Sequence, residues 1–394
     1  MKKLAFISVL CLCFILLVSC NSADEPIDIF TDESRPLPSP EEQIANCEHV
    51  LGEWRTFGAT NCITEGTEKR QCKFCPYEET IAVFGEHSYV GATCEFCGTL
   101  TPTANLRFEK DNSNDGYMLI IDDQITDSIL VIPEEHNSKP VTRINQIKPA
   151  RSVREVYIPK SLMVIDRGAF ANMTNLEVVH IPQDSVLYRI DDGAFLECTS
   201  LKEISFENCK LLSILGSEVF KNCSSLKTVK LPEKLKDIGG AAFKGCVSLE
   251  NINCLNKISY ISASMFEGCT GLKNIRIPDS ITEIHEYAFS NSGLEHVALP
   301  QSLTTLGRGV FYRCKSLQTV ELNGSITEIF ESTFFECSSL VEISASDNVL
   351  IAKIGKKAFA GCVSIQTLDF KIQGLAEIAS DAFDGCENLE NIPK

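Results

Sequence analysis

Phenylalanine recurs at intervals of 22–25 residues from residue 170 onward, ten times in succession. The positions are Phe170, Phe195, Phe220, Phe243, Phe266, Phe289, Phe311, Phe334, Phe359 and Phe383. A period in the twenties is typical of a solenoid, in which each repeat forms one coil and buries its apolar side against its neighbours. We therefore expect residues 151–394 to form one repeat array rather than separate globular domains.

A cysteine follows three residues after the phenylalanine in eight of the ten repeats, the exceptions being Met173 and Ser292. The eight are Cys198, Cys223, Cys246, Cys269, Cys314, Cys337, Cys362 and Cys386. Unpaired cysteine packs as a small apolar side chain. We therefore interpret this series, called the cysteine ladder below, as core residues rather than as disulfides or metal ligands.

Residues 226–248, LKTVKLPEKLKDIGGAAFKGCVS, represent one repeat. Leu226, Val229 and Leu231 have the spacing of a short strand whose apolar side chains face the core. Pro232 ends this strand, because proline has no amide hydrogen to donate to a neighbour. The following Ala-Phe pair is expected on a short helical or 3-10 turn. The predicted fold is a β-rich α/β solenoid with one parallel strand and one such turn per coil.

This pattern resembles the BspA-like leucine-rich repeats of bacterial surface proteins, whose signature is LxxIxIPxxIxxIGxxAFxxCxx. The signature is met at Leu272, Ile275, Ile277, Pro278, Ile281, Ile284, Ala288 and Phe289, and again at Leu294, Val297, Leu299, Pro300, Leu303, Leu306, Gly307 and Phe311. The resemblance spans residues 130–394. It implies a leucine-rich-repeat protein that adheres to host matrix proteins or to other bacteria through its solenoid.

The first 19 residues have the pattern of an export signal. Lys2-Lys3 precedes a run of 15 residues, Leu4–Val18, that is apolar except for Ser8; this run suits a signal peptide and is too short for a comfortable membrane span. The following Ser19-Cys20 resembles the bacterial lipobox, which implies a mature protein that begins at a lipidated Cys20. Anchoring by more than one acyl chain is stable. We expect a lipoprotein at the outer membrane or cell surface.

Residues 20–46 are expected to form an extended tether. They combine four prolines, Pro26, Pro36, Pro38 and Pro40, with seven acidic residues. Such a composition cannot bury enough apolar surface to fold, and its prolines keep the chain extended. The predicted role of this segment is to hold the rest of the protein away from the membrane.

Residues 47–100 form a small module rich in cysteine and histidine. Its cysteines are Cys47, Cys62, Cys72, Cys75, Cys94 and Cys97, and the last four form two CxxC turns separated by eighteen residues. Two such turns can present four thiolates to one structural zinc, with His49 and His87 as further candidate ligands. An exported module of this size is equally suited to disulfides. Both alternatives remain open, and either role is structural.

Residues 101–150 are expected to hold an N-terminal cap and a degenerate first repeat that begins at Val131-Ile132-Pro133. No C-terminal cap is recognisable after the last repeat. A bare final coil would expose a strand edge, and such edges pair readily with another chain. The sequence therefore predicts self-association, or docking of a partner, at this edge.

Charge and motifs exclude two classes of function. The chain has 36 Lys and Arg against 53 Asp and Glu, a net charge of −17, so it offers no basic surface for nucleic acid. None of the six histidines stands in a catalytic motif such as GxSxG or HExxH. We therefore predict that the protein is not an enzyme and has no catalytic cofactor.

Binding is expected on the polar side of the strands. The residues between the two core positions of each strand are His180, Ser205, Lys230, Asn253, Arg276, Ala298, Glu321, Ser344 and Asp369. The predicted partner-binding face consists of Lys227, Lys230, Asn253, Lys273, Arg276 and Glu321. The main hypothesis is a lipid-anchored surface protein that binds protein partners. The alternative is a periplasmic scaffold that docks a partner through the solenoid face or the uncapped edge.

Overall fold

The computed structural model describes residues 49–57, 65–73, 77–84, 89–90, 93–94, 101–253, 255, 258–347 and 349–390. The chain divides into two units, residues 1–101 and 102–394. In the first unit, β1 (Arg55–Phe57), β2 (Glu65–Gln71) and β3 (Glu78–Phe84) form an antiparallel sheet. A separate antiparallel pair consists of β4 (Tyr89–Val90) and β5 (Thr93–Cys94).

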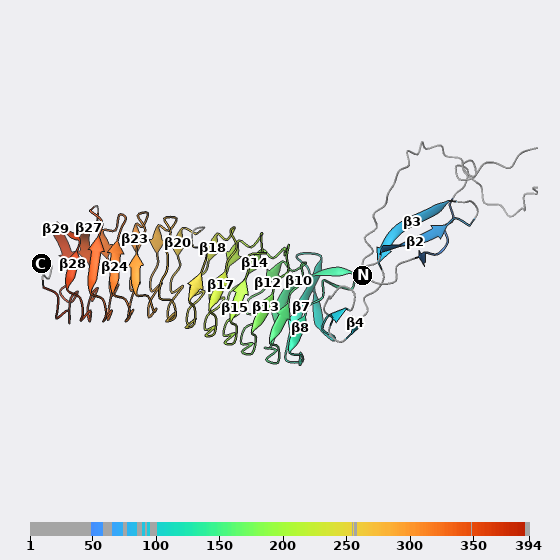
Figure 1. The fold of residues 1–394 in the computed structure, drawn as a ribbon, viewed down its shortest axis with the longest axis horizontal. Helices are drawn as coiled ribbons and strands as arrows, with labels where there is room; N and C mark the ends of the chain where they lie inside the picture. Colours follow the sequence, from blue (N-terminus) through green and yellow to red (C-terminus); the bar gives the residue numbers. More distant parts are fainter. Residues whose placement is uncertain are drawn as a thin grey trace, which may run out of the picture. The chain divides into compact units, whose positions relative to one another are not determined.

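The second unit is a stack of coils whose strands follow one another in chain order along a single array (Figure 1). It begins with an antiparallel hairpin of β6 (Arg107–Asp111) and β7 (Gly116–Ile121). Strand β7 then pairs in parallel with β10 (Lys139–Gln146), which also pairs with the short β9 (Glu135–His136). The hairpin thus lies at the start of the array.

Two rows of short parallel strands run along the array. The first strand wall consists of β8 (Ile129–Val131), β11 (Glu155–Tyr157), β13 (Val178–His180), β15 (Glu203–Ser205), β17 (Thr228–Lys230), β19 (Asn251–Ile252), β22 (His296–Ala298), β24 (Thr319–Leu322), β26 (Glu342–Ala345) and β28 (Thr367–Asp369). The second strand wall consists of β10, β12 (Val164–Ile165), β14 (Arg189–Ile190), β16 (Ile214–Leu215), β18 (Asp237–Ile238), β20 (Tyr260–Ile261), β21 (Glu283–Ile284), β23 (Thr305–Leu306), β25 (Glu328–Ile329), β27 (Leu350–Ile354) and β29 (Lys371–Ile378). Most coils therefore contribute two strands, where one was predicted.

The third side of each coil, the turn wall, carries the repeated phenylalanine. The predicted helical turn and the α/β label are wrong here, because the described residues contain no α-helix. Left-handed residues flank each repeated phenylalanine. The residue two positions after the phenylalanine has positive φ in all ten repeats, and the residue two positions before it does so in nine. Their φ values lie between +52° and +79°. An α-helix needs consecutive right-handed residues, so this alternation of hands makes a row of tight turns instead.

Backbone hydrogen bonds of the turn wall run from coil to coil. The amides of Gly168, Phe170 and Asn172 donate to the carbonyls of Asp192, Ala194 and Leu196 at 3.1, 2.8 and 2.7 Å. The same pattern is repeated along the array. A buried backbone amide needs a hydrogen-bond partner. Each coil therefore depends on its neighbour for these hydrogen bonds on both strand walls and on the turn wall.

The ten phenylalanine rings form one continuous stack in the core. Adjacent ring centroids are 5.0–5.8 Å apart and adjacent rings are within 2–12° of parallel. All except Phe383 are fully buried. Offset stacking of this kind adds to the gain from apolar burial, so each ring couples its coil to the next.

The cysteine ladder runs beside this stack, and none of its thiols forms a disulfide. Each Sγ–H donates to the backbone carbonyl of the phenylalanine in the preceding coil, at 2.9–3.2 Å between sulfur and oxygen. The position therefore needs a small apolar side chain with a weak donor, which cysteine supplies. The interpretation of these residues as core is confirmed.

Candidate protein-binding face

Strand pairing places the outward residues of the first strand wall in register. His180 lies beside Tyr157, Lys230 beside Ser205, and Glu321 between Ala298 and Ser344. The alternation of inward and outward side chains is imposed by the two-residue period of a strand. The predicted row is therefore in register at these positions, whereas Asn253 and Arg276 lie outside the strands.

A hollow of about 340 Å³ lies over β13, β15 and β17. Its lining consists of apolar strand residues together with one imidazole, one acid, one base and three short polar side chains. These side chains are His180, Glu203, Ser205, Asn208, Thr228 and Lys230. The hollow offers donors and acceptors of both charges to a ligand that lies along the wall.

An aromatic pair borders this hollow. The rings of Tyr157 and His180 stack with centroids 3.9 Å apart and planes within 11°. The carboxylate of Glu155 accepts a hydrogen bond from the Tyr157 hydroxyl at 3.4 Å and lies 3.3 Å from His180 Nε2. Burial, followed by the charge of Glu155, raises the pKa of Tyr157, so its hydroxyl stays protonated. The pair is thus held in place as a rigid, partly apolar surface.

His180 could be predicted from the sequence, whereas Tyr157 and Glu155 were not among the predicted residues. They lie in the repeat that follows the degenerate one, so their strand lacks the preceding Phe-Cys pattern that defines the register elsewhere. Alignment of Val156 with the buried Val179 would have placed Tyr157 beside His180. The Tyr157 ring adds an aromatic surface to the row of polar residues, which makes this part of the wall a candidate contact surface.

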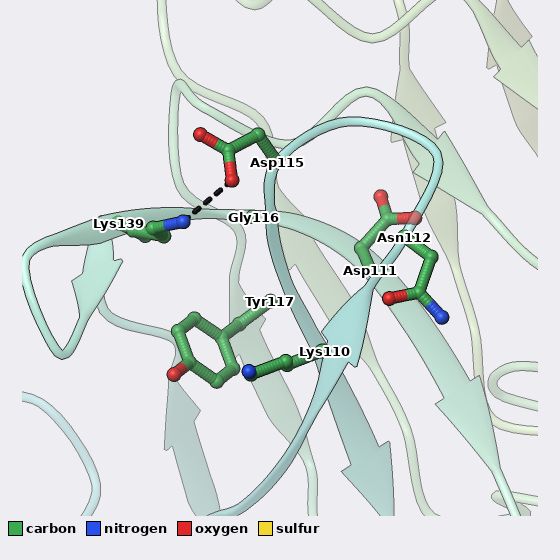
Figure 2. Close-up of a pocket in the computed structure, with 7 residues that line it drawn as sticks. All are labelled: Lys110, Asp111, Asn112, Asp115, Gly116, Tyr117 and Lys139. Atoms are coloured by element: carbon green, nitrogen blue, oxygen red, sulfur yellow. Dashed lines mark hydrogen bonds and ion pairs between the residues drawn. The ribbon is translucent and has the colours of Figure 1, made fainter.

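A second hollow, of about 430 Å³, lies at the β6–β7 hairpin (Figure 2). Figure 2 shows the Lys139 ammonium directed at Asp115, at 2.5 Å, and Lys110 beside the Tyr117 ring. Asp111 is buried and accepts a hydrogen bond from Thr142 at 2.7 Å. These groups fix the hairpin to β10, so we assign this hollow a structural role.

The family of the chain is decided by its repeats. A model described as the BspA type leucine-rich repeat region matches in six copies, over residues 148–273 and 260–390. The chain belongs to this BspA-type family. The resemblance seen in the sequence is thereby confirmed.

Solved structures of other leucine-rich repeat proteins are similar to this BspA-type protein. A leucine-rich repeat protein from Bacteroides ovatus has 24% sequence identity and a TM-score of 0.50, with coverage of 73% of this chain and 93% of that one. A leucine-rich cell surface protein from Faecalibacterium prausnitzii has 22% identity and a TM-score of 0.48, with coverage of 74% and 87%. The first of these supports the fold. No curated protein matches the chain.

The BspA-type array spreads the six predicted face residues over several coils. Lys230 lines the hollow and pairs with Glu207 at 3.3 Å. Lys273 pairs with Glu295 at 3.4 Å, and the exposed Arg276 forms no ion pair with any described residue. Exposed pairs such as these contribute little to stability, so the cations stay available to a partner.

The remaining predicted face residues are exposed, and two have structural partners. Asn253 follows β19, and its Oδ1 accepts from the Leu231 amide at 2.7 Å, which replaces a strand hydrogen bond. Glu321 Oε1 accepts a hydrogen bond from the side-chain Nδ2 of Asn323 at 3.2 Å. Lys227 lies one residue before β17. Of the six, only Lys230 borders the hollow, so the hollow and the predicted face overlap at this residue.

Several predictions concern residues that the structure does not describe. Cys20, Cys75, Cys97 and the Cys94 side chain lie outside the described residues, whereas Cys72 is described and buried. In the described part of the chain, no three His, Cys, Asp or Glu side chains gather as metal ligands would. The same part contains no helix with the length and apolar character of a membrane span. Zinc, disulfides and the lipid anchor therefore stay predictions.

Proposed function

We propose that the protein is a lipid-anchored surface protein that binds another protein through its first strand wall. The observation that carries this proposal is the hollow over β13, β15 and β17 with the Tyr157–His180 pair at its border. A row of parallel strands presents a long, regular surface, which suits an extended partner segment. Repeat proteins use such continuous surfaces for binding.

The chemistry of the hollow favours a protein ligand over a small molecule. Aromatic side chains are enriched among residues that dominate interface energies, and the Tyr157–His180 stack is already ordered. Glu203 and Lys230 add opposite charges at the hollow. Opposite charges set the register of a partner more than its affinity. The expected partner segment is extended, with an apolar side chain for the rings and both a base and an acid.

Removal of the aromatic pair is expected to weaken partner binding. The double variant Tyr157→Ala, His180→Ala should reduce recovery of the partner from cross-linked cells by about tenfold or more, because truncation of an interface anchor commonly has an effect of this size. The measurement is quantitative mass spectrometry of proteins cross-linked to the full chain in its own organism.

A matched control lies on the second strand wall. There Tyr260 stacks on His285 with centroids 5.1 Å apart and planes within 11°. The variant Tyr260→Ala, His285→Ala removes the same chemistry from the other wall and should leave partner recovery unchanged. Equal losses in both double variants would show that the first strand wall has no special role.

The lipid anchor is tested independently. Replacement of Cys20 by serine removes the thiol that the lipobox resemblance marks for acylation, so the protein should move from the membrane pellet to the soluble fraction. Cys13, within the same apolar run, provides the control, and Cys13→Ser should leave the protein in the pellet. A Cys20→Ser protein that still sediments with membranes would contradict lipid anchoring at this residue.

A protease added to intact cells then separates the surface hypothesis from the periplasmic one. We expect loss of the repeat region without cell lysis. Protection until the outer membrane is opened would favour a periplasmic scaffold instead.

A further inference from the structure

Three half-buried aromatic side chains form a row on the turn wall. The Tyr287 and Tyr312 rings meet edge to face with centroids 6.1 Å apart, and Tyr312 stacks on Phe335 at 5.1 Å and 12°. Tyr312 and Phe335 directly follow Phe311 and Phe334 of the repeat. The equivalent residues of the other coils are Ala171, Leu196, Lys221, Lys244, Glu267, Ser290, Ala360 and Asp384. The aromatic row is therefore confined to neighbouring coils.

Two exposed arginines lie over these rings. The Arg308 guanidinium carbon is 5.5 Å from the Tyr287 ring centroid, and that of Arg313 is 5.1 Å from the Tyr312 centroid. Arg313 is held by Glu336 through Nε–Oε2 and Nη2–Oε1 contacts of 2.9 and 3.3 Å. Arg308 forms no ion pair with any residue that the structure describes. We call Tyr287, Arg308, Tyr312, Arg313 and Phe335 the Tyr–Arg strip.

The position of the Tyr287 ring depends on a glycine in the next coil. Gly309 has φ +60°, and a Cβ on this residue would lie 2.4 Å from Tyr287 Cε1. The ring therefore lies directly against the Gly309 backbone, where a larger residue would displace it. The strip is consequently ordered before any partner binds, which lowers the entropy cost of binding.

The strip offers flat apolar rings and hydrogen-bond donors, a combination that suits a proline-rich segment. Such a segment forms a polyproline II helix, which leaves its carbonyls free and rises about 3.1 Å per residue. Residues three apart then lie on one side, about 9 Å from each other. The ring row, with centroid steps of 6.1 and 5.1 Å, is long enough for one such repeat. Aromatic grooves recognise proline-rich segments in this way.

The chain itself contains a segment with this chemistry. Residues 36–42 read Pro-Leu-Pro-Ser-Pro-Glu-Glu, so the apolar Leu37 and Pro40 stand three residues apart and two carboxylates follow. The carboxylates are complementary to the guanidinium of Arg308, which has no ion-pair partner among the described residues. The segment belongs to the first unit, up to residue 101, and the strip to the second. We assign the segment to another copy, and sedimentation of the full chain, described below, tests this source. We propose that the Tyr–Arg strip docks the proline-rich segment 36–42 of a neighbouring copy.

A peptide titration tests the docking site. The probe is a fluorescent peptide of residues 33–46, added to the full chain that carries Pro36→Ala, Pro38→Ala and Pro40→Ala so that its own segment does not compete. We expect saturable binding that Tyr312→Ala weakens by about tenfold or more. Tyr260→Ala, on the second strand wall, should leave binding unchanged. Circular dichroism confirms that both variants are folded.

Three results of the peptide titration would overturn the docking site. They are no saturable binding, equal binding by the Tyr312→Ala variant, and equal binding of a peptide whose three prolines are replaced by alanine. Saturable binding of a neutral oligosaccharide at the strip, without binding of the peptide, would likewise assign the strip to a carbohydrate and overturn the proposal.

Sedimentation of the full chain tests the source of the segment. The proposal expects association that increases with protein concentration and is lost in both Tyr312→Ala and the triple proline variant. Association that persists in the triple proline variant, or a chain that stays monomeric at all concentrations, would overturn the assignment to a neighbouring copy. Neither result depends on the first strand wall.

Discussion

Replacement of Phe266 by alanine should lower the free energy of unfolding by about 4 kcal/mol. The ring is fully buried and stacks on Phe243 at 5.7 Å and on Phe289 at 5.4 Å. Its loss removes apolar burial and leaves a cavity between neighbouring coils. Because stability in a repeat array is transmitted between neighbours, the two halves of the array should also begin to unfold separately. Urea unfolding followed by circular dichroism measures both effects.

Phe383 provides the matched control for this prediction. It occupies the same place in its repeat but is only partly buried, and it stacks on Phe359 at 5.1 Å. Phe383→Ala should therefore cost about half as much. Equal losses for the two variants, or a single unchanged transition in Phe266→Ala, would show that the phenylalanine stack does not couple the coils.

The free energy of unfolding should also fall steeply as the pH rises above 9. Burial is the main cause that raises the pKa of five ladder thiols, to about 11 in Cys314 and about 12 in Cys386, and well above the usual 9.0 in Cys198, Cys223 and Cys246. Above pH 9 the unfolded chain loses thiol protons that the folded chain keeps, so the unfolded state is favoured. Stability is therefore complete below pH 9 and declines from pH 9 up to the folded pKa values.

The size of this effect depends on the number of thiols involved. Each thiol that ionises only in the unfolded state lowers the free energy of unfolding by about 1.4 kcal/mol per pH unit. Urea unfolding at pH 8, 9 and 10 measures the slope. A Cys223→Ala, Cys246→Ala variant should be less stable at pH 8 but should show a slope smaller by about 2.7 kcal/mol per pH unit. An unchanged slope would mean that the thiols do not control alkaline unfolding.

The repeat could be predicted from the sequence because its period is visible in single residues. The spacing of Leu226, Val229 and Leu231 predicted the strands of the first strand wall, and the Phe-Cys interval predicted the buried positions of the turn wall. Such positions are specific because a one-residue shift would turn the apolar side chains outward. The family assignment rests on the same residues.

The turn wall could not be predicted, because its left-handed residues share no side-chain type. Gly168, Glu197, Ala241 and Tyr287 all adopt positive φ, although glycine and asparagine are the residues that favour it. Hydrogen bonds to the next coil impose this conformation, and these bonds cannot be inferred from the sequence of a single repeat. Because alanine has a high helix propensity, the sequence of the turn by itself predicts a helix.

The Tyr–Arg strip was missed for a related reason. Tyr287 and Tyr312 occupy different places in their repeats, two residues before and one residue after the phenylalanine. Their contact exists only because the coils stack in a defined register and because Gly309 leaves room for the ring. Neither condition can be read from a single repeat.

Photo-cross-linking from the first strand wall tests the proposed function most directly. A benzophenone side chain at Ser205, in the hollow, should form an adduct with one protein on intact cells, and Tyr157→Ala should abolish it. The control places the same group at the exposed Lys236, which adjoins β18 of the second strand wall and should give no such adduct. Adducts of equal yield from both positions, or none from Ser205, would contradict a protein-binding role for this wall.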